Sequence, residues 1–290
     1  MKTRILLKTT IGAIHDDWNV ARFSLLTEHL RGLTDSSGRA FYEVIARDRV
    51  EATGGGCDAD LAEAAAGAYD QLWLIAVDTT GALTPVDVEN IGRFRASGGG
   101  IVLTRDHQDL GACLTRLGAV GATQYFHTLN ADPDVSHHCC DDLDTPAISW
   151  PNFHSGANGD LQTISVLEPI HPLMRVAGGQ LIRRLPAHPH EGSVGVPSSL
   201  RNCARVVAQG RSATTGIAFN LCVAIEEPGQ GRVVSDSSFH HFCDYNWNTQ
   251  MGCPSFVDEP PGAEINSDPD ALHDGHCYVQ NISAWLAGRI

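Results

Sequence analysis

Histidines and aspartates stand side by side at several places in this 290-residue chain, which contains 14 histidines. The stretch TRDHQDLG places Asp106 next to His107 and adds Asp109 shortly after. A neutral imidazole can act as general acid or base, and a neighbouring carboxylate can fix its tautomer. Because both groups also bind Zn and Fe ions, the pair predicts either proton transfer or metal binding. The structural alternative is that Asp106 caps the following helix and His107 bonds to loop backbone.

A second pair of histidines, His240 and His241, ends the stretch GRVVSDSSFHHF. We expect residues 231–242 to form a strand, in which adjacent side chains point to opposite faces. Only one of the two histidines can therefore enter a pocket that it shares with His107. We predict that this histidine is the second catalytic group or a metal ligand.

The stretch LPAHPHEG supplies a third group of candidates. In an extended chain His188 and His190 project to the same side, and Glu191 lies beside them. An H-x-H pair can form half of a metal site, so we predict His188, His190 and Glu191 as ligands for a Zn or Fe ion. The alternative is a surface loop that prolines stiffen.

Two further stretches predict contacts with a substrate. In HDDW, one aspartate is expected to cap a helix, which leaves the other one and His15 for a ligand. The stretch WPNFHSGANGD combines aromatic and small residues with a histidine, which suits either a lid over a polar ligand or a subunit contact. The predicted substrate-binding residues are His15, Asp17, Asp109, His154 and Ser155.

Alternating strands and helices must position these side chains. Apolar periodicity predicts strands at residues 4–9, 41–46, 71–77 and 101–104, and helices at 20–30, 59–69, 85–97 and 110–117. The third helix has the clearest start, with Thr84 as N-cap, Pro85 in first position and Asp87 in the first turn. Strands and helices that alternate through short loops form right-handed βαβ units and a parallel sheet.

Polar side chains follow all four predicted strands, at residues 15–17, 47–49, 78–80 and 105–109. In parallel sheets of this kind, ligands bind beyond the carboxyl ends of the strands. We therefore expect one binding site along this edge of the sheet.

The remainder of the chain is less regular, and we expect it to belong to the same single domain. Residues 119–200 lack helical periodicity but contain aromatics, so we predict an ordered insertion that forms a pocket wall or a subunit contact. Strands are expected at 204–210, 216–227 and 231–242. An irregular tail, 244–270, precedes a closing helix at 277–290.

Residues 69–111 (YDQLWLIAV…TRDHQDLG) and 229–242 (GQGRVVSDSSFHHF) resemble the class I glutamine amidotransferase-like superfamily, and within it the ThuA-like (trehalose-utilisation) branch. The resemblance covers about residues 1–118 and 204–243. It implies an α/β fold, a flavodoxin-like three-layer sandwich with a mostly parallel central sheet, in which a late histidine faces the nucleophile elbow. The superfamily has a cysteine at that elbow, whereas Asp106 stands at the corresponding position here. Without a thiol no thioester with glutamine can form, so glutaminase activity is not expected.

Composition limits the class of partner. The 34 acidic and 20 basic residues give a net charge of −14, which disfavours nucleic acid and anionic membranes as partners. No apolar run approaches the length of a membrane span. Nine cysteines without a C-x-x-C motif, and no recognisable signal peptide, favour reduced thiols and a cytoplasmic location.

The function that these features predict is an enzyme acting on a small polar molecule by hydrolysis or proton transfer, with or without the help of a Zn or Fe ion. His107 would be the acid–base group or a ligand, Asp106 its orienting partner, and His240 or His241 the second group. The alternative is a non-catalytic module that binds a small molecule or forms a homo-oligomer. Convergence of the three histidine groups in space would favour the enzyme.

Overall fold

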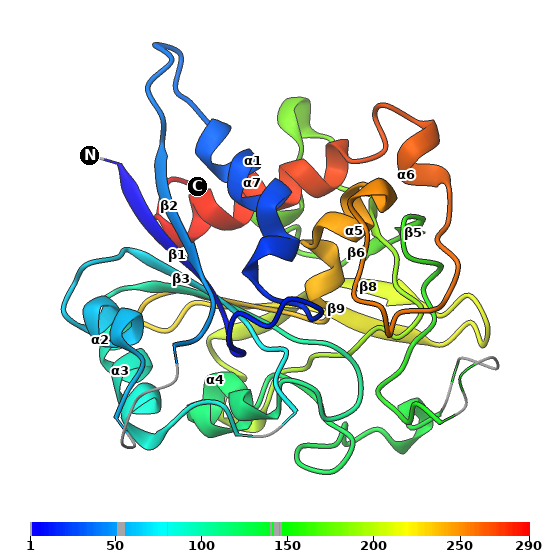
Figure 1. The fold of residues 1–290 in the computed structure, drawn as a ribbon, viewed down its shortest axis with the longest axis horizontal. Helices are drawn as coiled ribbons and strands as arrows, with labels where there is room; N and C mark the ends of the chain where they lie inside the picture. Colours follow the sequence, from blue (N-terminus) through cyan, green and yellow to red (C-terminus); the bar gives the residue numbers. More distant parts are fainter. Residues whose placement is uncertain (1, 51–55, 80, 140, 142–144, 146) are drawn as a thin grey trace.

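The computed structural model describes residues 2–50, 56–79, 81–139, 141, 145 and 147–290, and an eight-stranded sheet forms its centre (Figure 1). The strand order is β2-β1-β3-β4-β10-β9-β8-β6. The strands are β1 (Thr3–Thr9), β2 (Tyr42–Arg47), β3 (Gln71–Ile75), β4 (Gly100–Thr104), β6 (Ser165–Val166), β8 (Ala204–Arg211), β9 (Ala218–Ile225) and β10 (Val233–Asp236). Strands β5 (Leu161–Thr163) and β7 (Arg184–Pro186) pair separately.

The first five strands of this order run parallel, and the last three continue the sheet in antiparallel fashion. Strand β10 pairs with β4 even though more than a hundred residues separate them in the chain. The carboxyl ends of β4 and β10 therefore lie next to each other, which brings the segments after Thr104 and after Asp236 to one edge of the sheet.

Helices cover both faces of the sheet (Figure 1). One layer contains α1 (Ser24–Gly32), α5 (Asp244–Trp247) and α7 (His273–Leu286), and the other contains α2 (Ala59–Ala65), α3 (Pro85–Ala96) and α4 (Gly118–Gly121). A short helix, α6 (Glu264–Ser267), lies in the tail. The expected flavodoxin-like α/β sandwich with a mostly parallel sheet is confirmed.

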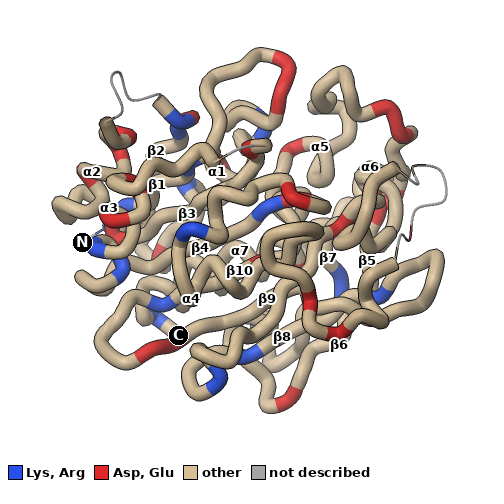
Figure 2. The backbone as a smooth tube through the Cα atoms, turned by 90° about the horizontal axis from the view of Figure 1, so that it is seen from below, with Lys and Arg blue, Asp and Glu red and all other residues tan. Residues whose placement is uncertain are grey.

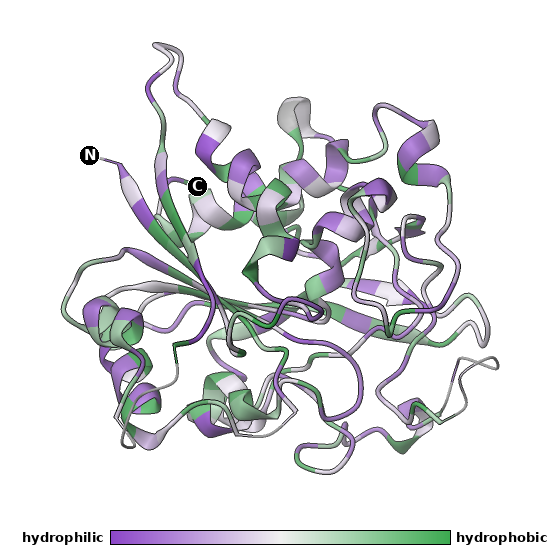
Figure 3. Ribbon diagram, viewed as in Figure 1, coloured by the Kyte–Doolittle hydropathy of each residue, from purple (hydrophilic) through white to green (hydrophobic). Residues whose placement is uncertain are grey.

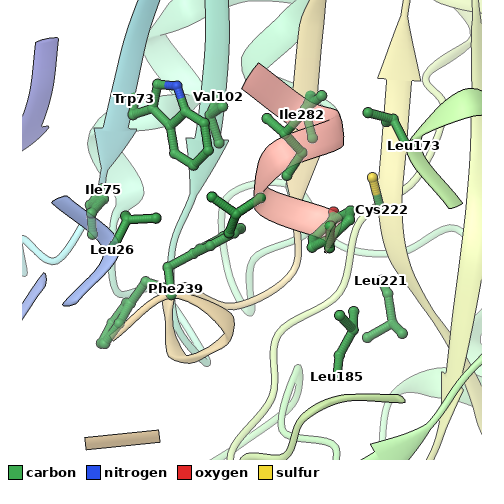
Figure 4. Packing of buried hydrophobic residues seen from close by; sticks show 14 of the residues in the cluster. Leu26, Trp73, Ile75, Val102, Leu173, Leu185, Leu221, Cys222, Phe239 and Ile282 are labelled. Atoms are coloured by element: carbon green, nitrogen blue, oxygen red, sulfur yellow. The ribbon is translucent and has the colours of Figure 1, made fainter. Parts of the chain in front are cut away.

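Two apolar clusters fill the space between the sheet and its helical layers. Trp73, Val102 and Ile282 belong to the cluster under α1 and α7 (Figure 4). Leu72 and Ile101, their sequence neighbours, belong to the cluster under α2 and α3. Because alternate residues of β3 and β4 enter opposite clusters, residues 72–75 and 101–103 are all apolar, and Figure 3 shows hydrophobic colour along the middle of the sheet.

The start of α3 matches the sequence prediction closely. Thr84 Oγ1 accepts a hydrogen bond from the Asp87 amide at 3.1 Å, and Asp87 Oδ2 accepts one from the Thr84 amide at 2.9 Å. These reciprocal bonds form a capping box around Pro85, the first helical residue. The helix ends before Gly98, whose φ of 97° favours glycine.

The change Thr84→Ala is expected to lower the free energy of unfolding by about 1 kcal/mol, because it leaves an amide of the first helical turn without its acceptor. Urea denaturation of the variant beside the wild type measures the difference. Val86→Ala, at an exposed position of the same turn, is the matched control. Equal losses in the two variants would contradict a capping role.

Several expected element boundaries differ in the structure, and the helix expected at 59–69 already ends at Ala65. Strand β10 ends at Asp236, so His240 and His241 lie on a 3-10 turn, η7 (Phe239–His241), in which the Ser238 side chain accepts a hydrogen bond from the His240 amide. The helix expected from residue 110 is a 3-10 helix, Ala112–Leu117. The closing helix begins at His273, four residues before the expected start.

Acidic and basic residues are spread over the loops and helices around the sheet (Figure 2). The cysteines at described positions form no disulfide with one another. Among the described residues, no helix combines the length and the hydrophobicity that crossing a bilayer requires.

Candidate active site

A cavity of about 400 Å³ opens at the carboxyl-end edge of the sheet. Segments that follow β1, β3, β4 and β10 form it together with parts of the insertion and the tail. Its lining includes six sequence-predicted residues, which are Asp17, Asp106, His107, His188, His190 and His240. The described residues of the loop after β2 do not line the cavity. Strand β2 is the edge strand, and Arg47 at its end and Arg49 beyond it pair with Asp60 and Asp87.

Asp106 lies at the centre of the histidines. Its Oδ1 is 3.3 Å from His107 Nδ1 and 3.6 Å from His188 Nδ1, and its Oδ2 is 3.8 Å from His240 Nε2. Burial by itself raises the pKa of this carboxyl, but His107 and His188 outweigh burial and hold the pKa well below its usual value. Asp106 is therefore an ionised carboxylate with imidazoles from three separate segments around it.

Three polar atoms at this point are buried without a hydrogen bond to any described residue. They are Asp106 Oδ1, His107 Nδ1 and His188 Nδ1. A buried polar atom without a partner costs on the order of 1–3 kcal/mol, so proteins retain such atoms mainly where a ligand, ion or water meets them. These three atoms are therefore available to a ligand, ion or water.

Arg105 fixes the turn that carries Asp106. Its buried guanidinium donates hydrogen bonds to the main-chain carbonyls of Asp106, Gln108 and Tyr125, and it lies over the ring of Phe126. Burial lowers the pKa of Arg105 to about 9. Because the next helix begins only at residue 112, Asp106 does not cap it, and the structural alternative for this aspartate is not observed.

Turn η7 positions His240 through its neighbours. Phe239 anchors the turn in the core (Figure 4), where its ring meets Trp18 and Phe23. His240 Nδ1 donates to Asn246 Oδ1 at 2.8 Å, which leaves Nε2 to face Asp106. Burial lowers the pKa of His240, but Cys243 and Asp106 reverse this and raise it to about 10.

His188 reaches Asp106 because its segment passes very close to the sheet edge. A Cβ atom on Gly192 would lie 2.4 Å from the Ser237 carbonyl oxygen and 2.9 Å from that of Asp106, so only glycine permits this approach. The His188 and His240 rings stack with 3.4 Å between their centroids. Burial, with a further contribution from His240, lowers the pKa of His188 well below its ordinary value.

His241 points away from the cavity, into the core. Its Nδ1 is 2.7 Å from Asp236 Oδ1 and its Nε2 is 2.9 Å from Glu191 Oε1, and all three side chains are fully buried. Burial opposes a charge on this ring, but Asp236 and Glu191 raise the pKa of His241 to about 10. Of the two adjacent histidines, His240 lines the cavity and His241 stabilises the core beneath it.

Glu191 belongs to the same buried network and not to a ligand set with His188 and His190. Its carboxylate accepts hydrogen bonds from Ser155, Gln162 and Ser237. An isolated bridge joins the main chain of Glu191 to that of Phe153, directly after a turn at Pro189 and His190, and Glu191 does not line the cavity. His190 lines the cavity, where its Nε2 is 2.8 Å from Thr145 Oγ1.

The structure places four of the five predicted substrate contacts outside this cavity. His15 is exposed, and His154 does not line it. Asp109 accepts hydrogen bonds from Thr128 at 3.0 and 2.7 Å and lines a neighbouring cavity of about 260 Å³. Ser155 links His188 to the buried network, because its hydroxyl accepts a hydrogen bond from the His188 amide and donates one to Glu191.

Several lining residues had not been predicted from the sequence. Phe256, Val257 and Glu259 come from the irregular tail, and Asn158 comes from the insertion. The tail reaches the site because Asp16 accepts a hydrogen bond from the Ser255 amide at 2.8 Å. Asn158 lies in the stretch WPNFHSGANGD that the sequence had indicated as a lid, and Trp18 directly follows the HDD run. The tail residues gave no local signal, since their contacts depend on the path of a distant segment.

Comparison with known proteins shows a similarity of fold to solved structures. No protein-family model and no curated protein sequence matches the chain. Among solved structures, the chain is similar to the mmIFT52 N-terminal domain, with 13% identity, a TM-score of 0.52 and coverage of 98% of this chain and 97% of that one. This similarity concerns the α/β fold alone.

Two further solved structures are similar at lower TM-scores. One is a Thermoplasma acidophilum protein described as a GMP synthase subunit, with 9% identity, TM-score 0.41 and coverage of 99% and 96%. The other is the glutaminase domain of Trypanosoma brucei CTPS with bound acivicin, with 14% identity, TM-score 0.46 and coverage of 100% and 95%.

Proposed function

We propose that this protein is a cytoplasmic enzyme on a ThuA-like variant of the amidotransferase-like fold, and that it acts on a small polar molecule by hydrolysis or proton transfer. The observation that carries the proposal is the buried Asp106 carboxylate, contacted by His107, His188 and His240 beside a cavity of about 400 Å³. Convergence of histidines from three segments favours an enzyme over a non-catalytic module.

His107 is the proposed acid–base group. Its Nδ1 faces Asp106 Oδ1, and its ring lies 5.3 Å from that of His190 on the cavity wall. A carboxylate at this distance stabilises the protonated form of the imidazole during proton transfer. A divalent ion held by Asp106, His188 and His240 would assist hydrolysis by activating a water molecule.

The charge of the lining favours neutral or cationic substrates. Asp17, Asp106 and Glu259 contribute carboxylates, and the described lining contains neither lysine nor arginine. An anionic substrate would meet repulsion from these carboxylates, and the described lining offers it no lysine or arginine to pair with. Trp18, Phe239 and Phe256 supply apolar walls, so a polar group attached to an apolar body fits best.

The proposal is tested with matched esters, amides and lactones that differ only in carrying a neutral, a cationic or an anionic substituent. Purified protein and the Asp106→Asn variant are assayed for hydrolysis of each compound. We expect turnover of neutral or cationic members by the wild type and loss in the variant. Equal rates in both proteins, or turnover confined to anionic members, would overturn the proposal.

Glutamine is expected to give no ammonia, and iodoacetamide is expected to leave any hydrolytic activity intact. The reason is that Asp106 occupies the elbow position, while the nearest cysteine in the sequence, Cys113, is buried and has a pKa that burial and Asp78 raise. Ammonia release is measured before and after alkylation. Glutamine turnover that disappears when one cysteine is labelled would contradict this expectation.

A further inference from the structure

We propose that Asp106, His188 and His240 together bind one divalent transition-metal ion, either Zn²⁺ or Fe²⁺. This inference rests on the proposed function for the location of the site, but its test measures binding and not turnover. Each of the three residues offers one ligand atom, and these atoms lie within 4.8 Å of one another. In the described part of the chain, this is the one group of three or more such side chains that meets this spacing.

The donor set has the composition of a catalytic metal site. Two imidazoles and one carboxylate hold the ion in zinc hydrolases and in non-haem Fe(II) enzymes, and both leave coordination positions open for water or substrate. Here all three residues also line the cavity, so the open positions would face the space where a substrate binds.

The unpartnered atoms described above point to the same ligand. The side chains of Asp106 and His188 are only 6% and 4% exposed, and Asp106 Oδ1 and His188 Nδ1 lack a hydrogen-bond partner among the described residues. A cation between them would satisfy both atoms, since each presents a lone pair when the carboxylate is ionised and the imidazole is neutral.

His240 has the outer support that metal-binding histidines require. Its Nδ1 donates to Asn246 Oδ1, and Asn246 Nδ2 in turn donates to the Ala187 carbonyl and to Asn158 Oδ1. These bonds fix the orientation of the amide and direct His240 Nε2 towards Asp106. A hydrogen bond of this kind from the second ring nitrogen orients the ligand and raises its basicity.

One ring must turn when the ion binds. The His188 and His240 rings are nearly parallel, with an interplanar angle of 12°, whereas a nitrogen lone pair lies in its ring plane and a shared ion must lie near both planes. His188 is the ring that can rotate about its Cβ–Cγ bond, because its Nδ1 has no hydrogen bond to a described residue, while Asn246 holds His240. Ligation also displaces any proton on His240, so binding weakens as the pH falls.

The test uses untagged full-length protein from which metals have been removed by chelation. Co²⁺ and Zn²⁺ are titrated separately, with calorimetry for stoichiometry and visible absorption for the Co²⁺ complex. We expect one ion per chain, visible Co²⁺ bands, and displacement of Co²⁺ by Zn²⁺. Asp106→Asn and His188→Asn should abolish this binding, and Asn246→Ala should weaken it by about 10- to 100-fold. His273→Asn, at an exposed histidine of α7, is the control and should bind as the wild type does.

His240→Cys separates loss of a ligand from loss of the fold. If residue 240 ligates the ion, the Co²⁺ complex of this variant gains a near-ultraviolet band from thiolate-to-cobalt charge transfer. Absence of stoichiometric binding in the wild type, unchanged binding in folded Asp106→Asn and His188→Asn, or absence of the new band would each overturn the inference. Metal binding without hydrolysis of any test compound would leave the inference standing and count against the proposed function. Hydrolysis by a protein that binds no ion would support the proposed function and overturn the inference.

Discussion

Replacing His241 with alanine is expected to lower the free energy of unfolding by about 3–5 kcal/mol, because it leaves the Asp236 and Glu191 carboxylates buried without their shared cation. All three side chains are fully buried, and His241 contacts the two carboxylates at 2.7 and 2.9 Å. Tyr278 also donates to Asp236 Oδ2 at 2.6 Å, so the loss extends to the packing of α7. Urea denaturation of both proteins at pH 6 measures the difference.

The difference should depend on pH in a defined direction. The pKa of His241 in the folded protein is about 10, above the ordinary value of about 6.5 that applies to the unfolded chain. The protonated ring therefore stabilises the fold fully below about pH 6.5, and this contribution is lost as the pH rises through 10. The difference in the free energy of unfolding between wild type and His241→Ala should therefore decrease steadily from pH 6.5 to pH 10.

His171 provides a control with the opposite sign. Burial, assisted by Arg205, lowers the pKa of His171 to about 4, so its neutral form is the stable one in the fold. The difference in the free energy of unfolding between wild type and His171→Ala should stay constant above pH 6.5 and decrease as the pH falls towards 4. If the two variants respond to pH in the same direction, His241 is not held as a cation between carboxylates.

Replacing His107 with alanine is expected to reduce turnover by about 10²- to 10⁴-fold, the usual contribution of a general acid or base. The melting temperature should change by no more than about 2 °C, because the side chain lies at a strand end on the cavity wall and contributes little to the core. The measurements are kcat with the best compound from the hydrolysis panel and thermal unfolding monitored by circular dichroism.

His273→Ala is the matched control for this experiment, since it removes an exposed histidine far along the chain on α7. It should retain wild-type kcat. A His107→Ala variant that keeps its activity but loses several degrees of thermal stability would show that the ring serves the structure of the turn and not catalysis.

Local features of the sequence determined the parallel half of this fold. Apolar runs predicted β1 to β4 within a few residues, and Thr84, Pro85 and Asp87 predicted the start of α3. Because the carboxyl ends of parallel strands share one edge, the position of Asp106 and His107 after β4 was also sufficient to place them at the edge of the sheet where the cavity opens. These predictions succeeded because each depends on residues that are close together in the chain.

The assembly of the site depended on tertiary structure. The alternation argument assigned His240 and His241 to a strand, but β10 ends at Asp236, and the 3-10 turn that follows decides which ring meets the cavity. His188 and His190 both line the cavity, but through a turn at 189–190 and not through the extended chain that the H-x-H spacing suggested. The spacing also could not show that Glu191 joins a core network with His241. Glu259 and Asn246 gave no local signal.

The sequence by itself therefore determined which elements form and which edge of the sheet carries polar groups, since backbone propensity and hydrophobic periodicity act over a few residues. Only the tertiary structure decided which of the histidines share Asp106. That choice depends on how distant segments pack, through contacts such as the close approach of Gly192 to the Asp106 carbonyl and the hydrogen bond from His240 to Asn246. Contacts of this kind leave no periodicity in the sequence, because each joins segments whose separation along the chain is unrelated to their distance in space.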